Sequence, residues 1–359
     1  MAINLASKYS DRIAEGFRLK SVVDGTVCKD YDFEGVKNLK IYTPVTQSLN
    51  DYKRSGTNRY GDPTELQDSL QDMTMMKDRS FSITIDKGNN SEQMDTKTAS
   101  RMLALEMDEK VIPEMDKYAL GKYIDFAGKR NALSAEPTED TIAKAISDGM
   151  VHMSNKKVPV QNRTIFIGWN WFGMLRLSKQ FIGVDDLAKN ILTNGTLGLF
   201  MGARVVPVPD EYLQKGGNQC YFLIVHKNSA IQPKKIQDYF AKQNPPGING
   251  SLLEGRFIYD AFVLSARCDG VYAAVAPSTV QANPTFSASG STLTVTSAGA
   301  TKIRVTLDGT DPLYSDSAIE TTSGGTVTLP SGKTKARAVA LDDVLFTSAV
   351  VEDSERTVA

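Results

Sequence analysis

Two short segments near the N-terminus alternate apolar and polar residues, a pattern typical of half-buried β-strands. They are residues 39–45 (LKIYTPV) and residues 80–86 (SFSITID). More than thirty mostly polar residues separate them, with cations and carboxylates interleaved. A compact domain rarely carries such a long irregular connection without a function. The segment is therefore either a solvated loop or an extended arm that lies on a neighbouring subunit.

After the second predicted strand, apolar residues recur with the spacing of an α-helix. Asn90 is a candidate N-cap, with Gln93 placed as in a capping box, and the pattern continues to about Lys129. Pro113 should kink this long helix or mark a join within it. Its apolar face, with spacings of three, seven, three and four, consists of Met102, Leu105, Ile112, Met115 and Ala119.

The rest of the first 276 residues reads as a mixture of helices and strands. A second helix is predicted from Thr138, with an apolar stripe at Ile142, Ile146, Met150 and Met153. The further predicted elements are strands at 163–169 and 220–226, short helices at 170–179 and 234–242, and a closing strand or hairpin at 256–276.

The composition changes at Pro277 and becomes rich in Ser, Thr, Ala and Val. Short alternating segments recur there, separated by turn sequences such as DGTDP and PSGK. This spacing predicts a small β-sandwich at the C-terminal end. Residues 277–284 (PSTVQANP) are its predicted linker.

Three closely spaced glycines, Gly195, Gly198 and Gly202, raise the question of a phosphate-binding loop. A nucleotide P-loop needs Lys followed by Ser or Thr after its last glycine, whereas Gly202 is followed by Ala and Arg204. A dinucleotide fingerprint needs GxGxxG before a helix, whereas VVPVP follows here and its prolines exclude a helix. The glycines therefore indicate a bend or close backbone packing in a β-hairpin.

Composition narrows the function further. The 359 residues carry a formal net charge of −1, three cysteines without a CxxC spacing, and only two histidines, His152 and His226. Neither histidine has a metal-ligand motif around it, and no strong catalytic motif occurs. The N-terminus lacks the apolar core of a signal peptide, and no segment reaches the roughly 18 apolar residues of a membrane span. We therefore expect a cytoplasmically made, non-enzymatic protein with no cofactor, no metal and no membrane partner.

The order of these segments resembles the major capsid protein of tailed double-stranded DNA phages, which has the Hong Kong 97-like fold. The resemblance covers residues 1 to about 276, and the order of the matching stretches is more specific than any one of them. These stretches are VPVQNRTIFIGWNWFGMLRLS (158–178), TLGLFMGARVVPVPD (196–210), LIVHKNSAI (223–231) and GRFIYDAFVLSARCDGVYAAV (255–275).

The resemblance implies an α+β chain divided along the capsid fold. The implied parts are an N-terminal arm (1–35), an extended loop (36–89), a spine helix with a peripheral domain (90–159), an axial domain (160–255), a return strand (256–276) and an immunoglobulin-like or fibronectin-like sandwich (277–359).

The resemblance also implies a role and partners. Copies of the chain would form hexamers and pentamers of an icosahedral head round double-stranded DNA, with a separate scaffolding protein and a portal protein. Assembly would take place in the host bacterial cytoplasm and the product would be the virion capsid. We expect neither N-terminal cleavage nor covalent cross-linking through Lys53 or Lys77. The implied contact residues are Lys53, Arg54, Arg59, Asp62, Glu65, Lys77 and Arg79 in the extended loop, and Gly195, Gly198, Gly202 and Arg204 in the axial hairpin.

The C-terminal segment VTLDGTDPLYSDSA (305–318) also resembles the terminal β-sandwich of some chitobiases. Turn chemistry explains its Asp and Gly residues, but Asp308, Asp311 and Tyr314 could instead form a surface turn that binds carbohydrate or a host surface. The alternative function is therefore a carbohydrate-active enzyme or a surface adhesin. On the capsid interpretation, residues 277–359 decorate the outer surface, and truncation after Ala276 should still permit shells.

Overall fold

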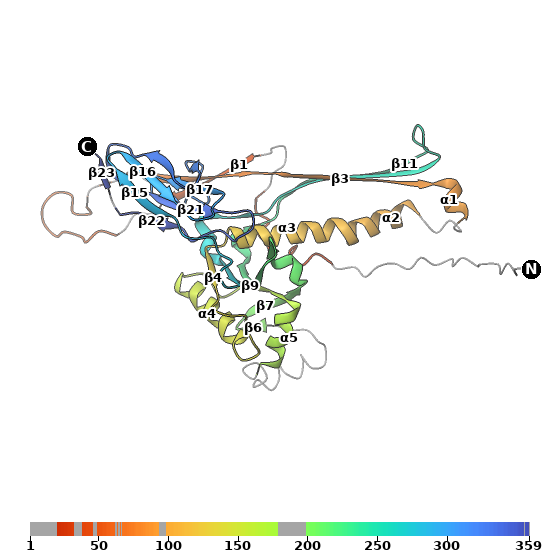
Figure 1. The fold of residues 1–359 in the computed structure, drawn as a ribbon, viewed down its shortest axis with the longest axis horizontal. Coiled ribbons are helices and arrows are strands. Elements are labelled where there is room, and N and C mark those ends of the chain that lie inside the picture. Colours follow the sequence, from red (N-terminus) through yellow and green to blue (C-terminus); the bar gives the residue numbers. More distant parts are fainter. Residues whose placement is uncertain are drawn as a thin grey trace, which may run out of the picture.

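The computed structural model describes residues 20–31, 38–45, 49–61, 63, 65, 67–92, 98–178, 199–354 and 356–358. Figure 1 shows three parts: a long ribbon of strands beside a long helix, a lobe carrying α4 and α5, and a β-rich C-terminal part. The C-terminal part lies at the opposite end of the ribbon from α1.

The ribbon is a three-stranded antiparallel sheet in the order β11-β12-β3. The helix beside it runs from α2 through a π-helical turn directly into α3, and Pro113 lies in the first turn of α3, just after this local change in the helical hydrogen-bond pattern. Stacking of Phe81 on Phe257, with ring centroids 6.0 Å apart, lies within the apolar cluster that joins ribbon and helix. The elements are β3 (Lys77–Asp86), β11 (Lys234–Gln243), β12 (Gly250–Tyr259), α2 (Ala99–Glu106), the π turn (Met107–Val111) and α3 (Ile112–Asp125).

The long helix is confirmed, but its predicted start is wrong. Asn90 lies inside a separate short helix, α1 (Lys87–Glu92), and α2 begins after Thr98. Gln93, the proposed capping-box partner, lies outside the described residues.

The short helix predicted at 234–242 is also wrong, because these residues form β11. The segment is too short for its apolar spacing to decide between helix and strand, and pairing with β12, interrupted only by an irregularity between Lys234 and Ile236, decides it. As a result, β11 and the start of β12 lie in the long ribbon and not in the sheet of β5, β7 and β9. The predicted closing strand at 256–276 is likewise divided among β12, β13 (Phe262–Val263), a 3-10 turn (Ser265–Gly270) and β14 (Val271–Val275).

A second sheet forms the centre of the molecule, with strand order β4-β14-β9-β5-β7-β6 and β8 paired to β9. The predicted strands at 163–169 and 220–226 are confirmed as β5 and β9, and the short helix at 170–179 as α5. The predicted stripe of the second helix is buried against one face of this sheet. The elements are β4 (Lys129–Ala132), α4 (Ile142–Asn155), β5 (Arg163–Gly168), α5 (Trp169–Leu177), β6 (Leu199–Phe200), β7 (Ala203–Val208), a 3-10 turn (Asp210–Leu213), β8 (Gln214–Lys215), β9 (Asn218–His226), a 3-10 turn (Lys227–Ser229) and β10 (Ala230–Ile231), which pairs with β13.

A separate two-stranded ribbon precedes β3 in the chain. The predicted strand at 39–45 is confirmed as β1 (Asn38–Val45), which pairs over its full length with β2 (Gln67–Thr74). The expectation of an irregular connection is therefore wrong for residues 67–74. Gln71, Met73 and Met75 are buried at alternate positions, so the strand period is present in the sequence, although its polar residues hide it.

The C-terminal residues form two small antiparallel sheets, β15-β16-β19 and β18-β17-β21-β22, and a pair β20-β23. Leu293 and Val295 from one sheet share an apolar cluster with Ile303 and Val305 from the other, so the two sheets pack over one core. The strands are β15 (Thr285–Ser289), β16 (Thr292–Thr296), β17 (Lys302–Thr306), β18 (Ile319–Thr321), β19 (Gly325–Thr328), β20 (Gly332–Thr334), β21 (Arg337–Leu341), β22 (Val351–Glu352) and β23 (Arg356–Val358).

This C-terminal part also belongs to the main core of the molecule. Leu313, Tyr314, Val339 and Phe346 are buried in one cluster with residues of α3 and of the central sheet. The predicted linker, residues 277–284, also packs against the C-terminal sheets. Val280 forms a β-bridge with Phe346, and Gln281, only 2% exposed, donates a hydrogen bond to Ser297 at 3.2 Å. The prediction that residues 277–359 can be removed without loss of assembly therefore conflicts with this packing.

Candidate subunit-contact surface

The loop that joins β1 to β2 folds back on itself between residues 49 and 61. The Lys53 amide donates to the Arg59 carbonyl at 2.9 Å, and the Gly61 amide donates to the Asn58 carbonyl at 3.0 Å. Gly56, Asn58 and Gly61 all have positive φ, which glycine and asparagine adopt more readily than other residues. Local sequence thus closes this loop, which we call the 49–61 loop.

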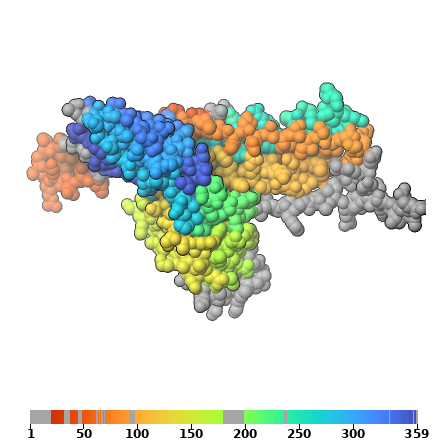
Figure 2. All heavy atoms as spheres, viewed as in Figure 1, coloured from red at the N-terminus to blue at the C-terminus, as the bar shows by residue number. Residues whose placement is uncertain are grey.

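Large apolar and aromatic side chains on the 49–61 loop face solvent. Leu49 is 99% exposed and Tyr60 is 84% exposed, and the ring of Tyr60 packs edge-on against Tyr52 with centroids 5.1 Å apart. Figure 2 shows the loop, in orange-red, standing out beyond the C-terminal sheets. Exposed aromatic residues gathered with cations are typical of a protein-binding surface.

The structure brings some of the predicted contact residues together on this loop and separates others. Lys53, Arg54 and Arg59 are exposed on the 49–61 loop, and Glu65 is exposed shortly after it. Asp62 lies outside the described residues.

Lys77 and Arg79 do not belong to the loop, because both lie in β3 beside α3. The Lys77 ammonium lies over the Tyr118 ring, 5.0 Å from its centroid, and Arg79 Nε donates to Glu114 Oε1 at 2.8 Å. Both residues thus join the ribbon to the helix within one chain, and their role in contacts between subunits stays a prediction. The predicted strand began at residue 80, whereas β3 begins at Lys77. The sequence therefore did not indicate that Lys77 and Arg79 lie in a strand.

The glycine-bearing hairpin is present as β6 and β7. Met201 and Gly202 form its turn, both with positive φ (49° and 80°), as a two-residue hairpin turn requires. Arg204 is exposed on β7 opposite Thr164 of β5, while Gly195 and Gly198 lie outside the described residues. Leu199 and Met201 are 55% and 50% exposed, so the tip of the hairpin is apolar.

The left-handed turn at Gly202 yields a stability prediction. Gly202→Ala should lower the free energy of unfolding by about 1 kcal/mol, because a Cβ disfavours positive φ. Gly173→Ala is the matched control: Gly173 lies in α5 with open space around its would-be Cβ, so this change should be neutral or stabilising. Thermal unfolding of the two variants compares them, and an unchanged melting temperature for Gly202→Ala would contradict the assigned turn.

The predicted surface turn of the C-terminal part has the expected local chemistry. The Asp308 carboxylate accepts hydrogen bonds from the Thr310 amide at 3.0 Å and from the Ser317 hydroxyl at 2.6 Å. Burial alone would raise the pKa of Asp308, but the hydrogen bonds from Ser317 and Thr310 outweigh it and hold the pKa below its usual value. Asp311 similarly accepts from the Leu313 amide at 2.9 Å. These contacts are those of a turn.

Tyr314 does not lie on the surface, so its predicted place in an exposed binding turn is wrong. Its side chain is only 6% exposed, its ring packs 6.0 Å from that of Phe126, and its hydroxyl donates to the Phe126 carbonyl at the end of α3. Burial raises the pKa of Tyr314 well above its usual value. An aromatic platform for sugar stacking is therefore lost from this turn.

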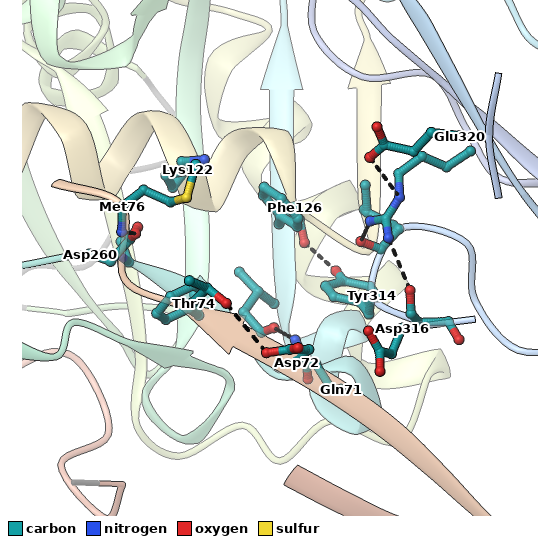
Figure 3. Close-up of a pocket in the computed structure, with 16 residues that line it drawn as sticks. Gln71, Asp72, Thr74, Met76, Lys122, Phe126, Asp260, Tyr314, Asp316 and Glu320 are labelled. Carbon is teal, nitrogen blue, oxygen red and sulfur yellow. Dashed lines mark hydrogen bonds and ion pairs between the residues drawn. The ribbon is translucent and has the colours of Figure 1, made fainter. Parts of the chain in front are cut away.

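A cleft of about 390 Å³ lies beside Tyr314, between β2, the end of α3 and the C-terminal sheets (Figure 3). Its carboxylates already have partners in the protein. Asp260 accepts from the Tyr118 hydroxyl at 2.9 Å and from the Met76 amide at 2.8 Å, and Asp316 pairs with Lys40 at 3.3 Å. The cleft is the boundary between the C-terminal sheets and the rest of the chain, and the sequence did not predict it.

The described residues offer little reactive chemistry. No three His, Cys, Asp or Glu side chains among them are grouped to hold a metal ion. Burial raises the pKa of the Cys268 thiol to about 12, raises the pKa of the Cys220 thiol well above its usual value, and lowers the pKa values of His152 and His226. The two thiols are thus protonated at neutral pH and poorly nucleophilic. Among the described helices, none is long and apolar enough to cross a membrane.

Comparison with solved structures identifies the fold. A chain of Mycobacterium phage Che8 superposes with a TM-score of 0.64 at 18% sequence identity, covering 76% of this chain and 98% of that one. A chain from the capsid structure of cyanophage P-SCSP1u gives a TM-score of 0.63 at 12% identity, covering 76% and 93%. A chain from the mature capsid of bacteriophage PhiM1 gives 0.59 at 14% identity, covering 77% and 93%.

The protein has a phage capsid-protein fold. This capsid fold, of mixed helices and sheets, spans nearly the whole length of the solved chains and leaves about a quarter of this chain uncovered. The uncovered share matches the size of residues 277–359. No family model and no curated protein matches the sequence.

Proposed function

We propose that this chain is the major capsid protein of a tailed double-stranded DNA phage. The observation that carries the proposal is the capsid fold over 93–98% of the solved chains it resembles. The proposed role is structural: copies assemble as hexamers and pentamers into an icosahedral head that encloses the genome. It requires no active site. A net charge of −1 suits the close packing of many copies.

Each part of the chain takes a role within this proposal. The β1–β2 ribbon with the 49–61 loop is the extended loop, and it carries exposed aromatic and cationic side chains suited to a neighbouring copy. The helix from α2 to α3 with the long β-ribbon is the peripheral region, and the central sheet with the β6–β7 hairpin is the axial region. The C-terminal sheets form an immunoglobulin-like sandwich on the outer surface of the head.

The alternative, a carbohydrate-active enzyme or surface adhesin, has less support. It rested on the resemblance of residues 305–318 to a chitobiase sandwich, and Tyr314, one of the three residues of the predicted binding turn, is buried. Scaffolding protein, portal protein and packaged DNA remain the proposed partners, and the virion capsid the proposed location.

Electron microscopy of the purified full chain, alone and after co-expression with a scaffolding protein, tests the proposal. We expect closed shells or rings of subunits in at least one of these conditions. A chain that stays strictly monomeric in all of them would refute a capsid role. Labelling of the C-terminal sheets on intact shells would test their outward position.

A further inference from the structure

The C-terminal part contacts the base of the β1–β2 ribbon directly. Gln71 of β2 forms an antiparallel β-bridge with Ser315, and the Lys40 ammonium of β1 lies 3.3 Å from the Asp316 carboxylate. Figure 3 shows Gln71 and Asp72 on one side of the cleft, with Tyr314 and Asp316 on the other. Both strands of the ribbon are therefore held by consecutive residues of one C-terminal segment.

That segment, residues 313–316, is itself rigidly held. Arg304 of β17 donates to the Leu313 carbonyl at 2.8 Å and to the Ser315 carbonyl at 3.0 Å. Tyr314, between these residues, is anchored on Phe126 at the end of α3. The segment is thus tied at once to the C-terminal sheets and to the long helix.

The opposite side of β2 is tied to the body of the molecule through the buried side chain of Gln71. Its amide nitrogen donates to the Val263 carbonyl at 2.8 Å, and its amide oxygen accepts from the Ser265 amide at 2.8 Å. A two-stranded ribbon is marginally stable alone and needs such support to keep one direction. β2 is therefore held between residues 263–265 on one side and Ser315 on the other.

We propose that residues 277–359 are an internal clamp, which fixes the direction in which the β1–β2 ribbon and its 49–61 loop leave the subunit. The part of this proposal that concerns a neighbouring copy rests on the proposed capsid function. The clamp itself is a property of the single chain, and it can be measured on unassembled subunits.

Amide hydrogen exchange of the full chain in its unassembled form tests the clamp. Asp316→Lys replaces an attraction to Lys40 by a repulsion at an exposed position, so exchange in residues 38–45 and 67–74 should rise about two- to fivefold. The swap Lys40→Asp with Asp316→Lys should restore protection. Asp148→Lys is the matched control, since it reverses an exposed Lys–Asp pair on α4 (2.8 Å to Lys144) far from the ribbon in sequence, and it should leave the ribbon unchanged.

Arg304→Ala is the stronger variant, because it frees the carbonyls of residues 313 and 315. We expect it to raise exchange in both ribbon strands more than Asp316→Lys does, while exchange in β5 and β9 stays slow. If Arg304→Ala does not fold, Asp316→Lys and its swap still decide the question. Unchanged ribbon exchange in Asp316→Lys would overturn the clamp and leave the capsid role standing. If the variants change ribbon exchange as expected but the wild-type chain never forms shells, the clamp stands and the capsid role is refuted.

Discussion

Removal of residues 277–359 is expected to leave a chain that does not fold stably. The truncation takes Leu313, Tyr314, Val339 and Phe346 out of the main core. Each buried side chain of this size contributes about 1.5–3 kcal/mol. Together they approach the roughly 5–15 kcal/mol of net stability that a domain usually has.

Soluble yield and thermal unfolding of the chain truncated after Ala276 measure this effect. The matched control is truncation after Ser354, which removes β23, its pairing with β20 and the ion pair between Arg356 and Asp353. We expect the control to remain soluble with a small fall in melting temperature, and the longer truncation to aggregate. A soluble 1–276 chain with the melting temperature of the full protein would contradict the shared core.

Elements whose apolar period matches their secondary structure could be predicted from the sequence. The stripe of α4, from Ile142 to Met153, is regular and buried, and β5 contains a continuous apolar segment, Ile165–Ile167, between Thr164 and Gly168. The DGTDP turn was also predictable, since Asp308 and Asp311 bond to backbone amides two residues further along. In each case the deciding interactions are local or follow from burial of one face.

Elements that depend on distant partners could not be predicted. β11 is a strand because β12 pairs with it. Tyr314 is buried against Phe126, 188 residues earlier in the chain, whose carbonyl accepts a hydrogen bond from the Tyr314 hydroxyl. Gln71 reads as a solvated polar residue, yet both ends of its amide are bonded to residues 263 and 265. The candidate contact surface was predicted only in part for the same reason: Arg79 resembles Arg54 and Arg59 in sequence, and only the fold pairs it with Glu114.

Deletion of residues 51–60 is expected to abolish shell assembly and leave the subunit folded. Asn50 and Gly61 already lie side by side, since Asn50 Nδ2 donates to the Tyr60 carbonyl at 3.3 Å and a Cβ on Gly61 would lie 2.3 Å from the same nitrogen. The chain can therefore be rejoined there without moving β1 or β2. A longer deletion, of residues 50–78, would also remove β2 and the buried Met73, and would confuse folding with assembly.

The deletion removes exposed side chains that have few contacts within the subunit, so its melting temperature should match that of the full chain. The assembled fraction, measured by sedimentation and electron microscopy, should fall by at least about tenfold, the effect of losing roughly 1.4 kcal/mol per subunit contact.

A second variant, Lys53→Glu with Arg54→Glu and Arg59→Glu, keeps the loop length and reverses its charge. If charge pairing contributes, high salt should weaken wild-type assembly and partly rescue this variant, because salt screens both attraction and repulsion between exposed charges. Normal shells from the deletion would show that the 49–61 loop is not a subunit contact.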